Sequence, residues 1–476
     1  MLHYFTRNKK LIHYLITLLF FFLFPLIPPM PPLTVNGMQM LGIFIGVVYG
    51  WTMLDMLWPS IMGLVVMGFY IGIPKVLGAS FGNPVVMMMI VMLVVMELLN
   101  KTKLTENLAI SIISNKLTLG KPWMFMFLFF VGSYIGSIVN PIVTIMLFMT
   151  FINQICKSID IPLRSPFTAV MAIGVGLSAL LGQTSLPFYN AGLSYTMTYA
   201  AMFQTMIPYG MWIIFFIGVS MFLLASYVLL VRFVMRIDVT NLKNIDLNIF
   251  GDKEKLNADQ KIAAGAFIAF LIIVCLSSFL PTTILGVVLN KFTTFGLVVI
   301  IAAVLMIMVK ESGDPVFDFR KLAATGISWD VVFMVALIMP MAQFLTGEET
   351  GIAPFLAVML QPLMGLPPTV FIILALALGA LITNFANNFV VALVIMPVIY
   401  SFAMQTGINP MGPIMVLFVC TQIAIGTPGA SFPIAICYSY ANIVDAKMMM
   451  KYAWISCIGL IILCLAVALP IAKLLF

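Results

Sequence analysis

Long apolar runs, each broken by a few polar residues, make up most of this chain. The runs at 85–99 and 122–156 do not alternate apolar with polar residues as a half-buried strand does. Several runs reach the ~20 residues that a helix needs to cross the hydrocarbon core of a bilayer. The pattern therefore predicts an all-α polytopic membrane protein rather than a membrane β-barrel.

One apolar run carries the same charge at both ends. Residues 122–156 are flanked by Lys121 on one side and Lys157 on the other. Loops rich in lysine and arginine stay on the cytoplasmic side of a membrane, so a single span cannot both begin and end there. The run therefore predicts a re-entrant helical hairpin, which enters the membrane and returns, with its tip near residues 136–141.

A second hairpin is predicted in the C-terminal half. No Lys or Arg occurs from Leu322 to Ala446, so the loops of this region are expected outside the cell. Within it, residues 367–404 repeat the order of the first hairpin, and a shift of about 248 residues places Asn140 on Asn388. A similar order with opposite flanking charge predicts an inverted repeat.

About eleven membrane-spanning helices, together with the two hairpins, account for the apolar runs. The one long polar segment holds many of the charges and is expected to be a cytoplasmic linker between the halves. The predicted units, in chain order, are N-terminal scaffold helices 1–80, a first repeat 81–231, the linker 232–261, further scaffold helices 262–310 and a second repeat 311–476.

The N-terminal sequence MLHYFTRNKK precedes an apolar run that ends near Leu26. This run is too long for the apolar part of a signal peptide, and PLIPPMPP follows it instead of a small-residue cleavage site. We expect an uncleaved first span with a cytoplasmic N-terminus, in a multi-pass protein of the cell membrane.

Polar side chains gather in the middle of the second hairpin, within GALITNFANNFVVALVIMPVIY at 379–400. Hydrocarbon cannot hydrogen-bond to an amide, so each such side chain left unpaired costs a few kcal/mol. These residues either join helices to one another or surround a polar solute. Chain breaks at 182–187 and 426–429 favour a solute, because non-helical backbone at membrane depth needs protein or a wet cavity beside it. The polar residues are Thr383, Asn384, Asn387 and Asn388.

The composition agrees with a membrane protein and argues against other classes. The 476 residues are 63% hydrophobic and 8% charged, with a net charge of +7. Basic residues that mark cytoplasmic loops explain this charge, so nucleic-acid binding is not expected. The two histidines, His3 and His13, lie near the N-terminus, and the six cysteines show no metal-binding spacing, so no cofactor is predicted.

The groups at the tips and breaks suit both a cation and an anion. Backbone carbonyls and the oxygens of Asn, Thr and Ser are hard, neutral ligands of the kind that bind Na⁺. Amide N–H groups and helix N-termini bind carboxylates and other oxyanions. The acidic residues nearest the membrane, Asp55, Glu97 and Asp330, lie near predicted span ends and are expected to be interfacial or helix-capping. Sodium coupling is therefore favoured over proton coupling, which usually needs a carboxylate or histidine at the site.

Four stretches, in this order, resemble the divalent anion/sodium symporters, which carry dicarboxylates, citrate or sulfate. The resemblance covers most of the chain beyond the first span, and it implies a homodimer. The stretches are FGNPVV at 81–86 with KTKLTENLA at 101–109, ISWDVV at 327–332, Asn388 followed by Pro397, and Gly426-Thr427-Pro428.

The same resemblance implies the residues of the site. In the second half, the implied ligands of a sodium ion are Thr383, Ala386, Asn388 and Gly426. The implied ligands of a substrate carboxylate there are Asn387, Asn388, Thr427 and Pro428. In the first half, Gly182 would bind the ion, and Asn140 would bind both the ion and the substrate.

The chain departs from the paired Ser-Asn-Thr motifs of that family. It has Val139-Asn140-Pro141 in the first hairpin and Asn387-Asn388-Phe389 in the second. The motif hydroxyls are therefore absent, and Val139 offers no side-chain oxygen to a first sodium ion.

Together these observations predict a secondary transporter that imports a small anion, such as a di- or tricarboxylate or sulfate, by alternating access with Na⁺. A cation/proton antiporter of related architecture is an alternative, and it would need Asp55 or Glu97. A membrane sensor built on a degenerate carrier fold would bind its ligand without flux. A polytopic enzyme would need a nucleophile facing a base, and the body of the chain has no histidine for that role.

Overall fold

The computed structural model describes residues 2–250, 257–280, 283–309, 313–346, 348–360, 362 and 365–476. Helices make up most of these ranges, and the isolated β-bridge found within them pairs Val309 with Pro315. Residues 251–256 of the predicted linker lie outside the described ranges. The prediction of an all-α protein is confirmed.

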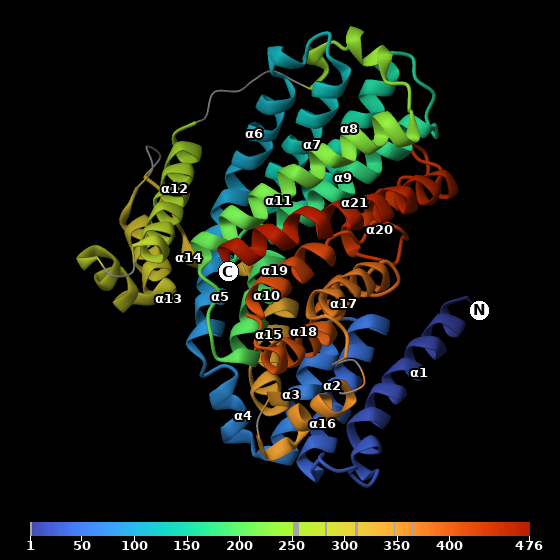
Figure 1. Ribbon diagram of the computed structural model, residues 1–476. Coiled ribbons are helices and arrows are strands. Elements are labelled where there is room, and N and C mark those ends of the chain that lie inside the picture. The colour runs from blue at the N-terminus through green and yellow to red at the C-terminus, as the bar shows by residue number, and fades with distance from the viewer. Residues whose placement is uncertain are drawn as a thin grey trace.

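The helices follow the predicted apolar runs and are labelled in Figure 1. A π-helical turn, Leu230–Met235, extends one of them, and short 3₁₀ turns join others. In chain order the α-helices are α1 (Leu2–Phe22), α2 (Val35–Met53), α3 (Leu57–Ile71), α4 (Ile73–Ala79), α5 (Pro84–Thr102), α6 (Leu104–Ile113), α7 (Pro122–Val139), α8 (Pro141–Ser158), α9 (Pro166–Thr184), α10 (Asn190–Phe203), α11 (Tyr209–Leu229), α12 (Ala258–Phe279), α13 (Ile284–Ile307), α14 (Phe319–Gly326), α15 (Trp329–Thr346), α16 (Ile352–Leu360), α17 (Pro368–Ile382), α18 (Asn388–Thr406), α19 (Met411–Cys420), α20 (Phe432–Ser439) and α21 (Ala446–Leu475).

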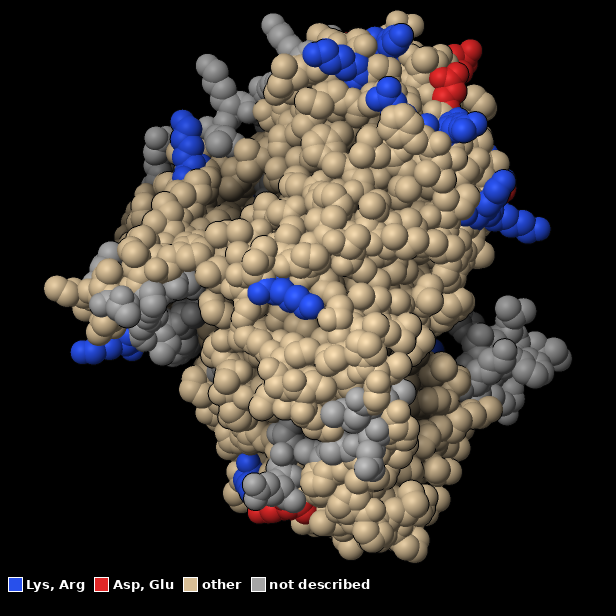
Figure 2. Space-filling view, in the orientation of Figure 1, with Lys and Arg blue, Asp and Glu red and all other residues tan. Residues whose placement is uncertain are grey.

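Within the described residues, seven helices are long and apolar enough to cross a membrane. An eighth span results if α14 and α15, which meet at 78°, are taken as one bent span. Shorter apolar helices, among them α3, α17 and α19, supplement these. Figure 2 shows charged side chains mainly at the ends and edges of one face, with a broad band between them that is almost uncharged. The chain is a multi-pass membrane protein.

Both predicted hairpins break and fold back on themselves. In the first, the rings of Phe129 on α7 and Phe148 on α8 lie 4.8 Å apart. In the second, Phe371 near the start of α17 stacks at 3.7 Å on Phe402 near the end of α18. A straight helix would separate Phe371 from Phe402 by roughly 45 Å at 1.5 Å per residue. The two helices of each pair therefore lie side by side.

Helix α9 is the most enclosed of the candidate spans, with 94% of its apolar membrane-length stretch buried. α7, α8, α11, α20 and α21 pack around it, and Figure 1 shows most of them as one bundle. Small residues allow this packing: a Cβ at Gly174 would lie only 2.2 Å from the ring of Phe130. α10, which follows α9, leaves this bundle and packs on α15 and α18.

The first scaffold helix after the linker begins earlier than predicted. α12 starts at Ala258 instead of near 262 because Asn257 and Gln260 form a capping box. Asn257 Oδ1 accepts a hydrogen bond from Gln260 N at 2.8 Å, and Gln260 Oε1 accepts one from Asn257 N at 3.1 Å. The pair satisfies backbone donors that have no partner within the helix, so polar residues continue it past the apolar run.

Candidate functional site

Asn140 ends α7 and begins α8, which makes it the tip of the first hairpin. Its backbone is extended (φ −138°, ψ 92°), as is usual before proline, and its Oδ1 accepts a hydrogen bond from Val143 N at 3.1 Å. Pro141 then starts α8 at a position where a missing N–H costs nothing. Gly136 allows the close turn, since a Cβ there would lie 2.7 Å from Thr144 Oγ1.

The first tip packs against the first chain break. A Cβ at Gly182 would lie 2.5 Å from the carbonyl oxygen of Tyr134, so the contact requires glycine. Asn190 begins α10 with φ 50° and donates from Nδ2 to the carbonyls of Ile138 and Val139, both at 3.3 Å. These carbonyls end α7 and have no partner in their own helix, so Asn190 caps the tip from outside.

The second tip is longer than the first. Residues 383–387 link α17 to α18, and Asn387 caps α18 by accepting from Phe389 N at 3.0 Å and from Val390 N at 3.4 Å. The cap that corresponds to Asn140 is therefore Asn387, whereas the shift of 248 residues pairs Asn140 with Asn388. The reason is that the link between α17 and α18 is longer than the link between α7 and α8. A single shift without gaps therefore cannot align both helices of the first hairpin with both helices of the second.

Hydrogen bonds join the second tip to the second chain break. Thr383 Oγ1 donates to the carbonyl of Thr421 at 3.1 Å. Gly426 N donates to Asn384 Oδ1 at 2.7 Å, and Thr427 Oγ1 donates to the carbonyl of Asn384 at 2.5 Å. These bonds replace partners that the backbone loses where it leaves the helix. Two non-helical segments thus satisfy one another inside the protein.

Asn384, which the resemblance did not place in the site, is central to this contact. It is fully buried, and its Nδ2 also donates to the carbonyl of Ala380 at 2.8 Å. A Cβ at Gly426 would lie 2.7 Å from Asn384 Oδ1, so the glycine is needed for the contact. For Asn384 the structure supports the first of the two interpretations, in which a polar side chain joins helices.

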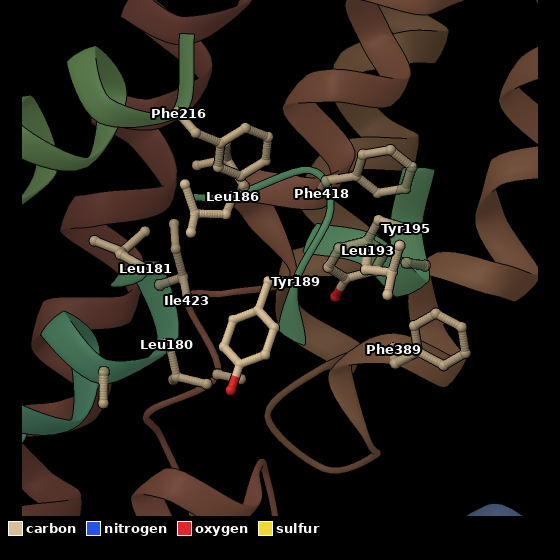
Figure 3. Close-up of a cluster of buried hydrophobic side chains, with 14 of the residues drawn as sticks. Leu180, Leu181, Leu186, Tyr189, Leu193, Tyr195, Phe216, Phe389, Phe418 and Ile423 are labelled. Carbon is tan, nitrogen blue, oxygen red and sulfur yellow. The ribbon is translucent and has the colours of Figure 1, made fainter. Parts of the chain in front are cut away.

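Sequence reasoning missed Gln422 and Tyr195. Asn388 Nδ2 donates to Gln422 Oε1 at 3.2 Å, and Gln422 Nε2 donates to the Tyr195 hydroxyl at 2.7 Å. Gln422 stands in the apolar run LFVCTQIAIG (417–426), so the argument that singled out the Asn cluster applies to it equally. Tyr195 had no such signal, because its partners come from the other half of the chain. Figure 3 shows it in the buried cluster with Phe418 and Phe389.

The structure groups most of the predicted residues around two tips. Among the hydrogen bonds of the described residues, none joins Asn140 directly to Asn388; α10 connects the tips through Asn190 and Tyr195. Around the second tip lie Thr383, Asn388, Gly426 and Thr427, with Ala386 and Asn387 half-buried beside them and Pro428 exposed; at the first tip lie Asn140 and Gly182.

Among the hydrogen bonds of the described residues, none joins the three acidic residues considered from the sequence to a residue of either tip, although Glu97 lies near Tyr189 at the start of α10. Asp55 is exposed and accepts from Trp58 N at 2.8 Å at the start of α3, and Asp330 is exposed in the first turn of α15. The Glu97 side chain is 12% exposed and accepts from Thr325 Oγ1 at 2.8 Å, which ties α5 to α14. Each therefore has a position that helix capping or packing explains.

Two cavities of similar size lie elsewhere than around the site residues. One, of about 640 Å³, is mainly apolar and runs along α18 from Val394 to Gln405. The other, of about 650 Å³, is polar and includes Lys101 and Lys321. None of the predicted site residues lines either cavity.

The enclosed tips, the chain breaks and their neutral polar groups define a multi-pass membrane protein of the transporter class. A family model described as citrate transporter (CitMHS) matches residues 40–421, which is well over half of the chain. The chain belongs to this citrate transporter family, a family of transporters and not of enzymes.

Individual relatives match over shorter stretches. Human solute carrier family 13 member 4 is 23% identical over 154 residues, 32% of this chain and 24% of that protein. The mouse Na(+)/citrate cotransporter is 24% identical over 147 residues, 31% of this chain and 25% of that protein. The match thus spans about a quarter of the length of these relatives.

A solved structure supports the fold. The crystal structure of the YdaH transporter of Alcanivorax borkumensis superposes with a TM-score of 0.55 at 12% identity. It covers 84% of this chain and 88% of that one. At this identity the likeness concerns the fold alone.

Proposed function

We propose that the protein is a secondary transporter that moves a small di- or tricarboxylate of the citrate type, or a sulfate-like anion, into the cell by alternating access with Na⁺. The observation that supports this most directly is the contact between the second tip and the second chain break, through Thr383, Asn384, Gly426 and Thr427. Non-helical backbone at membrane depth is tolerated beside protein or a wet cavity, and broken helices of this kind form the solute sites of many transporters. Membership of the citrate transporter family supports the class of anion.

The donors that an anion needs are present at both tips. Asn140 and Asn387 use Oδ1 to cap α8 and α18, and among the described residues neither Nδ2 has a hydrogen-bond partner. Each Nδ2 is therefore a neutral donor beside a helix N-terminus, where the helix dipole favours negative charge. Each amide thus offers a carboxylate oxygen a donor without placing a fixed charge in the membrane.

The proposed coupling ion is Na⁺, with Thr383, Ala386, Asn388 and Gly426 as its ligands and Asn140 and Gly182 as the candidates of the first half. Hydroxyl, amide and carbonyl oxygens are hard donors that match this ion. Among the described residues, none of the three acidic residues considered hydrogen-bonds to a tip residue, which favours Na⁺ over H⁺.

The proposed membrane arrangement extends the observed helices. It has about eleven spans with a cytoplasmic N-terminus, two re-entrant hairpins in inverted repeats, and a homodimer. The units are scaffold helices 1–80 and 262–310, repeats 81–231 and 311–476 with hairpins 122–156 and 367–404, and the linker 232–261.

Counterflow in proteoliposomes tests the function. Vesicles loaded with unlabelled citrate, succinate or sulfate are diluted into the labelled anion, with external Na⁺ or choline at equal pH. We expect accumulation of a carboxylate that requires Na⁺. Absence of flux with any of these anions would contradict the proposal, and saturable binding without flux would support the sensor instead.

A further inference from the structure

A chain of buried hydrogen bonds reaches Asn388 from the other half of the molecule. It runs from Asn388 to Gln422 at 3.2 Å, from Gln422 to Tyr195 at 2.7 Å and from Tyr195 to Thr421 at 3.1 Å. Thr421 ends it by donating to the carbonyl of Phe418 at 3.0 Å. Tyr195 belongs to α10 in the first half, and the other members belong to α18 and to the region around the end of α19 in the second.

The direction of every bond in this chain is determined. The Phe418 carbonyl can only accept, and it lies 3.0 Å from Thr421 Oγ1 and 3.4 Å from Gln422 Nε2. Thr421 therefore has no hydrogen left for Tyr195, which must donate to it, and the Gln422 amide must turn its nitrogen toward Tyr195. Gln422 Oε1 then faces Asn388, so that Asn388 must present Nδ2 to it.

Packing fixes the hydroxyl on which this direction depends. The Tyr195 ring is stacked on Phe418 at 4.6 Å and lies 5.6 Å from the ring of Phe389, and its side chain is 1% exposed (Figure 3). Gln422 is fully buried. A change at Tyr195 would leave Gln422 Nε2 with only the longer bond to the Phe418 carbonyl, 3.4 Å, so the amide would be held in its orientation less firmly.

We propose that Tyr195 is a positioning residue of the transport site, which acts through Gln422 to set the orientation of the Asn388 amide. This inference rests on the proposed function. If Gln422 turned over, its nitrogen would face the Asn388 nitrogen, and Asn388 would have to rotate. The Asn388 oxygen, which accepts from Phe389 N at 3.0 Å, would then lose that bond and leave the position from which it can bind a cation. The orientation of the Asn388 amide at the second tip thus requires α10 to pack against α18 and α19.

Counterflow kinetics of Tyr195→Phe test this role. The ring and its stacking remain and only the hydroxyl is lost, so we expect the KM for Na⁺ to rise about fivefold or more, the effect of one buried hydrogen bond, with kcat within about twofold. The control is Tyr199→Phe one turn along α10, a buried tyrosine whose ring contacts Phe203 at 4.9 Å and whose hydroxyl is not part of this chain of bonds, so its loss should leave both constants unchanged.

A double-mutant cycle separates positioning from general damage. Gln422→Met removes both bonds of the amide, so adding Tyr195→Phe to it should raise the KM no further. Gln422→Glu, when protonated, can accept from Asn388 and donate to Tyr195, so it should lie nearer to wild type than Gln422→Met. If Tyr195→Phe does not fold, the comparison of the two Gln422 variants carries the test.

The outcomes distinguish the two proposals. Wild-type flux with an unchanged KM in Tyr195→Phe, or additive effects in the cycle, would overturn the positioning role alone. No flux in the wild type would overturn the proposed function and the positioning role with it.

Discussion

At the scale of single residues, the amides at the tips differ in how many of their two ends the protein itself uses. Asn140 and Asn387 each use Oδ1 to cap a helix, which leaves Nδ2 as a donor. Asn384 instead has both ends in hydrogen bonds within the protein. The same residue type thus has two roles, and only its contacts reveal which.

The division at Asn387 leads to a prediction for Asn387→Asp. Aspartate caps a helix as well as asparagine does, so thermal stability should stay within ~0.5 kcal/mol of wild type. The new carboxylate replaces the free donor and repels an anion, so counterflow of the labelled carboxylate should fall at least tenfold.

Asn257→Asp at the cap of α12 is the matched control, since it makes the same substitution at a cap away from both tips. Undiminished flux in Asn387→Asp would exclude Asn387 from anion binding.

Asn384→Ala should lower the stability of the fold more than it changes the specificity of transport. It removes the acceptor of Gly426 N and leaves that buried N–H unpaired, at a cost of about 1–3 kcal/mol. Unfolding in detergent, followed by tryptophan fluorescence, measures this loss. Thr150→Ala, an exposed position that bonds only its own helix, should cost much less. Equal losses in the two variants would show that the contact between tip and break contributes little.

At the scale of elements, the hairpins and breaks depend on glycines that remove steric conflict. Gly136 permits the turn of the first hairpin, and Gly182 permits the break after α9 to lie on it. Gly426 does the same for the second tip. The sequence showed glycines in these regions, but which backbone each one meets depends on how the helices pack.

Gly182→Ala should therefore disrupt the contact between the first tip and the first break. Its Cβ would lie 2.5 Å from a backbone oxygen that cannot move alone, and overpacking of this kind costs about 1–3 kcal/mol. We expect a lower melting temperature and at least a tenfold loss of flux. Gly218→Ala in α11 meets nothing within 4 Å and should be neutral or slightly stabilising. If both variants behave like wild type, tight packing at Gly182 is not required.

At the scale of the whole molecule, α10 connects the two tips, while other helices, such as α20 and α21 on α9, also pack across the two halves. Its first residue, Asn190, caps the first tip, and Tyr195, five residues later, reaches the second. A change in the position of α10 would therefore affect both tips. In a carrier that alternates between two states, such a helix would let each tip respond to the state of the other.

The proposed orientation predicts which loops can be labelled from each side. Lys243 and Glu349 are exposed and lie in segments expected on opposite faces of the membrane. A cysteine at Glu349 should react with a membrane-impermeant maleimide in intact cells, and one at Lys243 only after permeabilisation. The natural cysteines give a low background, since five are buried and Cys275 is half-buried. Reaction of Lys243→Cys in intact cells would overturn the orientation.

The sequence alone determined the class of molecule and the places where its helices break. Apolar runs too long for any soluble core predict membrane helices, and Asn140 before Pro141 or Thr427 before Pro428 disfavours the continuation of one. These features depend on a residue and its near neighbours, so they can be read along the chain. Even so, the sequence did not show that Asn387 rather than Asn388 corresponds to Asn140, because this depends on how the second tip folds.

Only the tertiary structure decided which polar groups meet. Tyr195 and Gln422 are 227 residues apart, and Asn384 and Gly426 are 42 apart, yet each pair shares a hydrogen bond. Hydrocarbon requires that buried polar groups find partners but does not specify which ones. That choice depends on how closely helices approach, which small residues such as Gly182 allow, and it follows from packing of the complete fold rather than from any local pattern.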